Sequence, residues 1–135
     1  MSEIIVFDTS VVIDNLRTGR HLPRIAALTG LIRSSSVVLA ELWRGAGTKA
    51  EREFLRALER NHPILTPTAR DWLESGRLLS KMRTDRGLQP HKLRDLHMDV
   101  LIALTARACG ARLITTNRAD FELIRNYRDF KLDIW

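Results

Sequence analysis

The sequence has little of what marks several common classes of protein. Its one cysteine, Cys109, excludes an internal disulfide and is typical of a reducing compartment. No apolar run approaches the roughly 20 residues that span a bilayer, and Asp8 cuts the first such run short, which argues against a signal peptide. The four histidines have no metal-ligand spacing and no glycine-rich phosphate loop occurs, so neither a zinc site nor nucleotide-triphosphate binding is expected. These absences indicate a cytoplasmic protein.

What is present fits one globular domain with an excess of positive charge. Of the 135 residues, 44% are hydrophobic and 28% are charged, which is enough for a single domain over residues 1–135 with its own core. Lysine and arginine number 22 against 16 acidic residues, giving a net charge of +6. An excess of this size favours a polyanionic partner, because neutralising phosphates supplies most non-specific affinity for nucleic acid.

Short apolar runs alternate with helical patterns along the chain. The run from Ile4 to Phe7 predicts a strand buried on both faces. Further short strands are expected within 34–39 (turning into a helix), 63–67, 111–115 and 130–135, with a small packed element at 25–32. Helical patterns occupy 49–60, 68–86, 93–108 and 117–125. Strands separated by helices need crossover connections, so we expect an α/β fold with a central parallel sheet of four to five strands flanked by helices.

Four acidic residues lie at or near the ends of these elements. Asp8 follows the first strand directly, and Glu41 follows the second, at the start of its helix. Asp99 lies in the first half of the long helix beside an apolar run, and Asp120 lies in the turn after the strand at 111–115. In an open parallel sheet, ligands bind beyond the carboxyl ends of the strands, so we expect the four carboxylates to converge there.

A cluster of four carboxylates needs a compensating cation. Two carboxylates about 4 Å apart repel each other by roughly 4 kcal/mol at an effective dielectric constant near 20. Ligands that are all oxygen suit Mg²⁺ or Mn²⁺, and such an ion can bind a phosphate oxygen and activate water for in-line attack. The pattern therefore predicts that Asp8, Glu41, Asp99 and Asp120 are the catalytic metal ligands of a nuclease.

Each of the four acids also has a local structural explanation. Asp8 could cap the helix that follows it, and Glu41 could be a solvated glutamate in a first helical turn. Asp99 could form a salt bridge with Arg94 or His97. Asp120, three residues after Asn117, could belong to a helix cap. A capping acid can also bind metal, so these explanations do not exclude the site.

Two further acids lie near the predicted site in sequence. Asp95 precedes Asp99 by one helical turn and shares its face, so it either joins the site or is simply an acid early in the helix. Asp14 follows Asp8 by six residues and is interpreted as a local acid of the helix or loop.

Four stretches of the sequence resemble the motifs of PIN-domain ribonucleases. They are Phe7–Asp14, Ser36–Leu42 followed by Gly45 and Ala46, Asp99–Ala103, and Thr115–Phe121. Any one of these motifs is weak, but all four in order at compatible spacing are specific. Length and motif order resemble the VapC toxins of bacterial toxin–antitoxin pairs. The resemblance covers essentially the whole chain and implies a PIN-like three-layer fold.

The resemblance also implies a site and its partners. It assigns Asp8, Glu41, Asp99 and Asp120 to an acidic centre that holds Mg²⁺ or Mn²⁺ and hydrolyses RNA, with Thr9 or Ser10 and Asn117 supporting it by hydrogen bonds. It implies a homodimer and neutralisation by a VapB-type antitoxin. Asp95 and His97 are more polar than the family pattern leads us to expect, which leaves a fifth acid open.

Two other functions are compatible with part of the pattern. A haloacid-dehalogenase-type phosphohydrolase would use Asp8 as its nucleophile, but that family has a second aspartate two residues later, where this chain has Ser10. A non-catalytic RNA-binding module would use the basic surface and keep the acids for structure. Covalent phosphate on Asp8 would indicate the first, and tight RNA binding without turnover the second.

Overall fold

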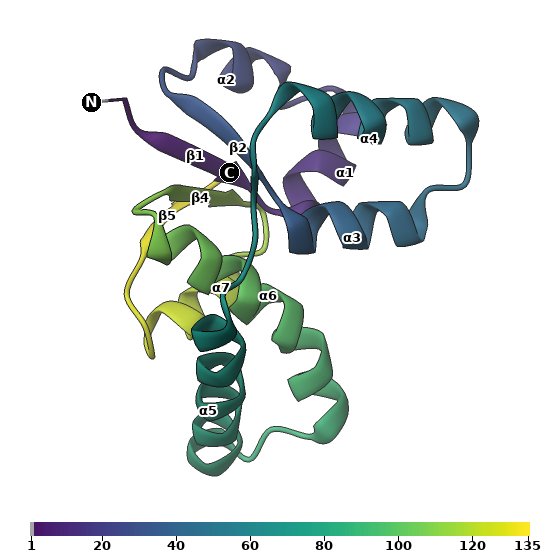
Figure 1. Ribbon diagram of the computed structural model, residues 1–135. Helices are drawn as coiled ribbons and strands as arrows, with labels where there is room; N and C mark the ends of the chain where they lie inside the picture. Colours follow the sequence, from purple (N-terminus) through teal and green to yellow (C-terminus); the bar gives the residue numbers. More distant parts are fainter. Residues whose placement is uncertain (1) are drawn as a thin grey trace.

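The computed structural model describes residues 2–135, which form five strands and seven helices (Figure 1). The strands are β1 (Ile4–Phe7), β2 (Leu31–Ser35), β3 (Ile64–Leu65), β4 (Arg112–Thr115) and β5 (Lys131–Ile134). The helices are α1 (Thr9–Thr18), α2 (Leu22–Ala27), α3 (Ser36–Gly45), α4 (Lys49–Asn61), α5 (Ala69–Arg86), α6 (Pro90–Ala108) and α7 (Arg118–Arg125). None of these helices is both long and apolar enough to cross a membrane.

The strands form one parallel sheet in the order β3-β2-β1-β4-β5. The first strand is therefore the central one: Val6 pairs with Arg33 of β2 on one side and with Leu113 of β4 on the other. The order steps outward from β1 in both directions, which places a topological switch point between β1 and β4. The expected α/β class and parallel sheet are confirmed, with five strands.

The helices form two groups around the sheet (Figure 1). Helices α1, α3 and α4 pack on one another beside β1 and β2, whereas α5 runs along α6, which in turn contacts α7 and β4. Right-handed crossovers that step in opposite directions along a sheet place their helices on opposite faces, which gives three layers. The carboxyl ends of β1, β2 and β4 lead into α1, α3 and α7, so the helix that follows each strand starts at the same edge of the sheet.

The core lies between the sheet and α6. Ile5 and Val6 are fully buried, as are most residues of α6 from Leu96 to Ala106. This burial explains why the second half of α6 is apolar on nearly all sides: it is enclosed by α3, α5, α7 and β4. Asp99 is carried by this buried helix, so its carboxylate is held by a rigid element.

The second predicted strand is in the wrong place. The structure places β2 at Leu31–Ser35, whereas Val37, Val38 and Leu39 form the buried face of α3. Ser35 caps α3 by accepting a hydrogen bond of 3.3 Å from the amide of Val38. β-Branched residues favour strands, but tertiary burial outweighs that preference here. Glu41 consequently lies in the second turn of α3 and not at its start.

Gly30 fixes the entry into β2. Its φ of +142° is one that L side chains rarely adopt, and a Cβ placed there would lie 2.6 Å from the carbonyl oxygen of Glu3. The same carbonyl accepts a hydrogen bond of 2.7 Å from the amide of Leu31, which begins the pairing of β1 with β2. Close approach of two backbones therefore requires glycine at this position.

Candidate active site

Asp8 is fixed at the carboxyl end of β1 by three hydrogen bonds. Its side chain is almost fully buried, and its amide donates to the carbonyl of Ile114 on β4 over 2.9 Å. One carboxylate oxygen, Oδ2, accepts hydrogen bonds of 2.8 Å from the hydroxyls of Ser10 and Thr115. Asp8 occupies the N-cap position of α1, yet its side chain caps no amide. Among residues 2–135 nothing donates to Oδ1, so helix capping does not account for this acid.

Glu41 projects from α3 toward the start of α1. The hydroxyl of Thr9 donates a hydrogen bond of 2.8 Å to its Oε1. Burial raises the pKa of the Glu41 carboxyl, the Thr9 hydroxyl opposes that rise, Asp8 adds to it, and Arg44 opposes it. A glutamate whose pKa rises because it is buried beside another carboxylate is not a solvated first-turn residue.

Asp99 is partly buried on α6, and its carboxyl has a strongly raised pKa. Burial, followed by the charges of Asp8, Asp120 and Glu41, raises the pKa of its carboxyl to about 8, and Lys92 opposes this rise. Neither Arg94 nor His97 pairs with it, since His97 bonds instead to the hydroxyl of Ser75. Within the described chain no group donates a hydrogen bond to Asp99. The charges of the three other predicted acids all act on the carboxyl of Asp99, so the four carboxylates lie in one region of the structure.

Asp120 lies in the first turn of α7 and has partners on both oxygens. Its amide donates to the side chain of Asn117, the N-cap residue, and the Asn117 amide group donates back to Oδ2 over 3.1 Å. The ammonium of Lys92 lies 2.8 Å from Oδ1. The capping explanation of Asp120 is therefore correct, and it coexists with membership of the acidic cluster.

The two remaining acids do not join the cluster in this structure. Asp95 is exposed, and it is not among the carboxylates that raise the pKa of Asp99. Asp14 accepts hydrogen bonds of 2.6 Å from Arg20 and His21, and Arg20 foremost lowers the pKa of its carboxyl. The interpretation of Asp14 as a local acid is confirmed.

Two residues of this region were not predicted from the sequence. Thr115, fully buried at the end of β4, donates to Asp8 and also accepts from the amide of Asn117 over 2.9 Å. The sequence signal for Thr115 is a hydroxyl residue at the end of a buried apolar strand. Lys92 gave no comparable signal, because its position near the start of α6 lies 28 residues from its partner Asp120.

The carboxylate oxygens of the four acids suit a hard divalent cation, although they are not arranged around a single metal position in this structure. Within residues 2–135, no three acidic, histidine or cysteine side chains form a group that could hold a metal ion as they stand. All four acids nevertheless offer only oxygen, and the charges of the other three all raise the pKa of Asp99. Uncompensated negative charge on hard ligands is the condition that a divalent cation relieves. The residues fit such an ion chemically, and binding it requires the carboxylates to draw together.

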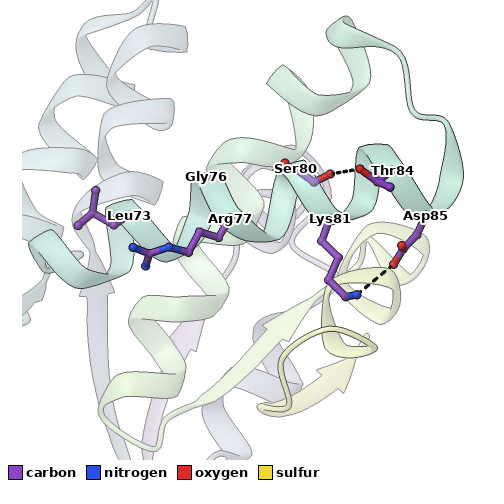
Figure 2. Close-up of a pocket in the computed structure, with 7 residues that line it drawn as sticks. All are labelled: Leu73, Gly76, Arg77, Ser80, Lys81, Thr84 and Asp85. Atoms are coloured by element: carbon purple, nitrogen blue, oxygen red, sulfur yellow. Dashed lines mark hydrogen bonds and ion pairs between the residues drawn. The ribbon is translucent and has the colours of Figure 1, made fainter.

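Of two hollows in the surface, one shares no residue with this cluster and the other shares Glu41. A shallow one follows the exposed side of α5, and Figure 2 shows its side chains, none of them from the acidic site. A groove of about 490 Å³ lies between α1, α3 and α4. It is lined by apolar side chains together with Arg17, Glu51 and Glu41, so one end of the groove is formed by an acid of the cluster.

Comparison with known proteins places this geometry in a family. The PIN domain family matches residues 5–126, which includes all four acids. No curated protein matches the chain. A chain of VapBC2 from Rickettsia felis, in a crystal structure with a DNA fragment from the promoter, is 25% identical, has a TM-score of 0.72, and the match covers 98% of each chain.

Two other solved structures share the fold. A chain of VapBC-5 from Mycobacterium tuberculosis is 23% identical with a TM-score of 0.63 and a match covering 98% of each chain. A chain of DNA-bound VapBC from Salmonella typhimurium is 20% identical with a TM-score of 0.64, covering 100% of this chain and 99% of that one. The predicted PIN-like fold is confirmed by these matches, and the chain belongs to the PIN-domain family, as a VapC-type member of it.

Proposed function

We propose that this VapC-type nuclease is a metal-dependent endoribonuclease and the toxin of a toxin–antitoxin pair. The observation that carries the proposal is Asp99: a partly buried carboxylate without a hydrogen-bond donor among the described residues, under the charges of three other carboxylates, on a rigid helix. Such an arrangement disfavours folding unless a cation compensates it. Its presence at the switch point of a parallel sheet points to a bound divalent ion in the working enzyme.

Some residues of the chain would bind that ion directly, and others would orient these ligands. Asp8, Glu41 and Asp99 would supply the ligands, with Ser10 and Thr115 orienting Asp8, and Thr9 orienting Glu41. Asp120 adds a fourth carboxylate to the site and is oriented by Asn117. When bound, Mg²⁺ or Mn²⁺ supplies an activated water and neutralises charge on a phosphodiester. The hydroxyl donors that fix Asp8 and Glu41 lower the cost of ordering these two ligands.

RNA as the substrate follows from charge and compartment. The net charge of +6 attracts a polyanion, although the acids at the site repel one. Arg44, on α3 close enough to act on the charge of Glu41, is a basic side chain at the rim of the cluster. An enzyme acting on cellular RNA in this way works in the cytoplasm. The phosphate backbone would be guided by arginine and lysine, whereas base contacts would decide the cleavage sequence.

Partners follow from the solved relatives and from the groove between α1, α3 and α4. Relatives of this fold were crystallised as VapBC complexes, so we propose that a VapB-type antitoxin binds this chain and that the chain also forms a homodimer. The groove offers the apolar side chains of Ile13, Leu42 and Phe54, and it includes Glu41. An apolar antitoxin segment seated there would cover one wall of the active site. Loss of complex formation in Phe54→Lys, with nuclease activity retained, is the expected result.

The experiment that tests the enzymatic proposal compares Asp99→Asn with Asp95→Asn. The two positions lie one turn apart on α6, yet only Asp99 belongs to the cluster. We expect Asp99→Asn to lower cleavage of total RNA by at least about a hundredfold, since it removes a metal ligand, and Asp95→Asn to retain it. EDTA should abolish cleavage by the wild type and Mn²⁺ should restore it. Cleavage that persists in EDTA, or equal activity of the two variants, would exclude the proposed function.

The same assay separates the alternatives. Binding of RNA by the wild type at saturating Mg²⁺ without any cleavage would indicate the RNA-binding module. A phosphoryl group trapped on Asp8 would indicate the phosphohydrolase. The phosphohydrolase family has an aspartate at the position of Ser10. Here the hydroxyls of Ser10 and Thr115 donate to Oδ2 of Asp8 instead, which argues against that function.

A further inference from the structure

Lys92 is a cation built into the acidic cluster. Its ammonium lies 2.8 Å from Oδ1 of Asp120, and its side chain is 37% exposed. The other oxygen of Asp120 accepts a hydrogen bond from the side-chain amide of Asn117. Both oxygens of Asp120 are thus occupied by donors of the chain itself, whereas Asp99 has none within the described residues. Asp120 is already compensated, and Asp99 is not.

The position of Lys92 on its helix is unfavourable without Asp120. Pro90 is the first residue of α6, which places Lys92 in the first turn, and that turn has no acidic residue. The positive end of the helix dipole lies there and disfavours a cation. The carboxylates of the cluster must outweigh this cost. Placement of the lysine is therefore explained by the cluster and not by the helix.

The influence of Lys92 extends beyond its partner. Its positive charge also opposes the rise in the pKa of Asp99. At the far side of the cluster, Arg44 acts on Glu41 in the same sense. The cluster consequently has two ends: Asp120 with its lysine, and Asp8, Glu41 and Asp99, which keep free carboxylate oxygens.

We propose that Lys92 takes the place of a second divalent cation, so that the site binds one ion through Asp8, Glu41 and Asp99, while Asp120 serves as the lysine's partner. This rests on the proposed metal-dependent function and specifies its metal count. Four carboxylates with Lys92 and one divalent ion carry one net negative charge. A second ion would reverse that sign and would have to displace the ammonium from Oδ1 of Asp120.

The test counts Mn²⁺ ions bound to the purified chain. Equilibrium dialysis against saturating Mn²⁺ gives the stoichiometry, and electron paramagnetic resonance shows whether two ions are coupled, as ions about 4 Å apart are. Wild type and Lys92→Arg, which keeps the charge, should bind one uncoupled ion. Lys92→Met, of similar length but neutral, should bind two coupled ions. Lys92→Met combined with Asp120→Asn should return to one, because the second ion needs Asp120.

The outcomes distinguish this inference from the function on which it rests. Two ions in the wild type, or one ion in Lys92→Met, would overturn the role of Lys92 and leave metal-dependent cleavage intact. A wild type that binds no Mn²⁺ would overturn the proposed function and the inference with it. If thermal unfolding shows Lys92→Met to be misfolded, Lys92→Gln provides the same neutral substitution, and one ion in that variant would overturn the inference equally.

Discussion

The hydroxyl of Thr9 donates a hydrogen bond of 2.8 Å to Oε1 of Glu41, 32 residues further along the chain. It joins the first turn of α1 to the second turn of α3, and so connects the segments that follow two neighbouring strands. The bond favours the ionised carboxylate against burial and against the charge of Asp8. Thr9 therefore orients Glu41 and favours its ionised form in the absence of metal.

Replacing Thr9 by valine should weaken the site without unfolding the chain. Valine has the same shape but no donor, so the pKa of Glu41 rises further and its orientation is lost. A hydrogen bond to a charged group contributes about 1.5–3 kcal/mol, so Mn²⁺ affinity should fall by about tenfold or more. Isothermal titration measures this. Thr9→Ser keeps the hydroxyl and should stay within about threefold of wild type; equal losses in both variants would refute the role of the hydrogen bond.

Thr115→Val should destabilise the fold as well as the site. The buried hydroxyl donates to Asp8 and accepts the amide hydrogen of Asn117, and valine leaves that amide without this acceptor. We expect a loss of about 1–3 kcal/mol in the free energy of unfolding, measured in urea. Thr116→Val is the control, because the Thr116 hydroxyl forms no hydrogen bond within the described part of the chain. A loss of the same size in both variants would contradict this assignment.

The metal-free protein should lose stability as the pH rises from about 4 to about 8. The pKa of Asp99 is about 8 in the fold, against an ordinary value of 3.8, so the folded chain holds a proton that the unfolded chain has released. The free energy of unfolding therefore falls with pH across that window, with a slope of at most about one proton, and levels off above it. Urea denaturation in EDTA at several pH values measures the slope.

Two controls accompany the pH series. Asp99→Asn removes the titrating group, so its contribution to the slope should vanish and the metal-free variant should be more stable than wild type at pH 9. Saturating Mg²⁺ should abolish the decline in the wild type, because the ion stabilises the carboxylate form. A wild-type stability that rises between pH 4 and pH 8 in EDTA, with Asp99→Asn unchanged, would exclude a raised pKa at this position.

Gly30→Ala should be costly for reasons of backbone geometry alone. The new Cβ would meet the carbonyl oxygen of Glu3 at 2.6 Å, at a φ that alanine rarely adopts. We expect a loss of about 1–3 kcal/mol in the free energy of unfolding. Gly47→Ala is the matched control, since a Cβ there meets nothing within 4 Å. Metal affinity of the folded Gly30 variant should remain unchanged, because Gly30 is remote from the acids in the sheet register.

The parts of the fold that local chemistry determines were predictable from the sequence. Asp8 follows a strand buried on both faces, and strands buried in this way belong to parallel sheets with their ligands at the carboxyl edge. Asn117 and Asp120 at cap spacing gave the start of α7 within one residue. In these places, burial and capping preferences agree with the final structure.

The errors occurred where tertiary context decides. Val37 and Val38 favour a strand by intrinsic preference, yet they pack into the core as part of α3. Lys92 could not be assigned to the site from the sequence, because its role depends on how α6 and α7 lie against each other. Because Asp95 lies one turn before Asp99, the sequence allowed it to be a member of the site or an ordinary acid early in the helix. Only the burial of α6 in the fold shows that Asp95 is exposed and Asp99 partly buried.

The central position of β1 affects when the acidic centre can form during synthesis of the chain. The strand that carries Asp8 is translated before its neighbour β4, which holds Thr115, 107 residues later, and the carbonyl that receives the Asp8 amide hydrogen. A nascent chain, or one truncated before position 114, lacks two of the three hydrogen bonds that hold Asp8 and lacks Asp120 altogether. The acidic centre is therefore completed only after α7 has been synthesised, and termination before α7 yields a product without it.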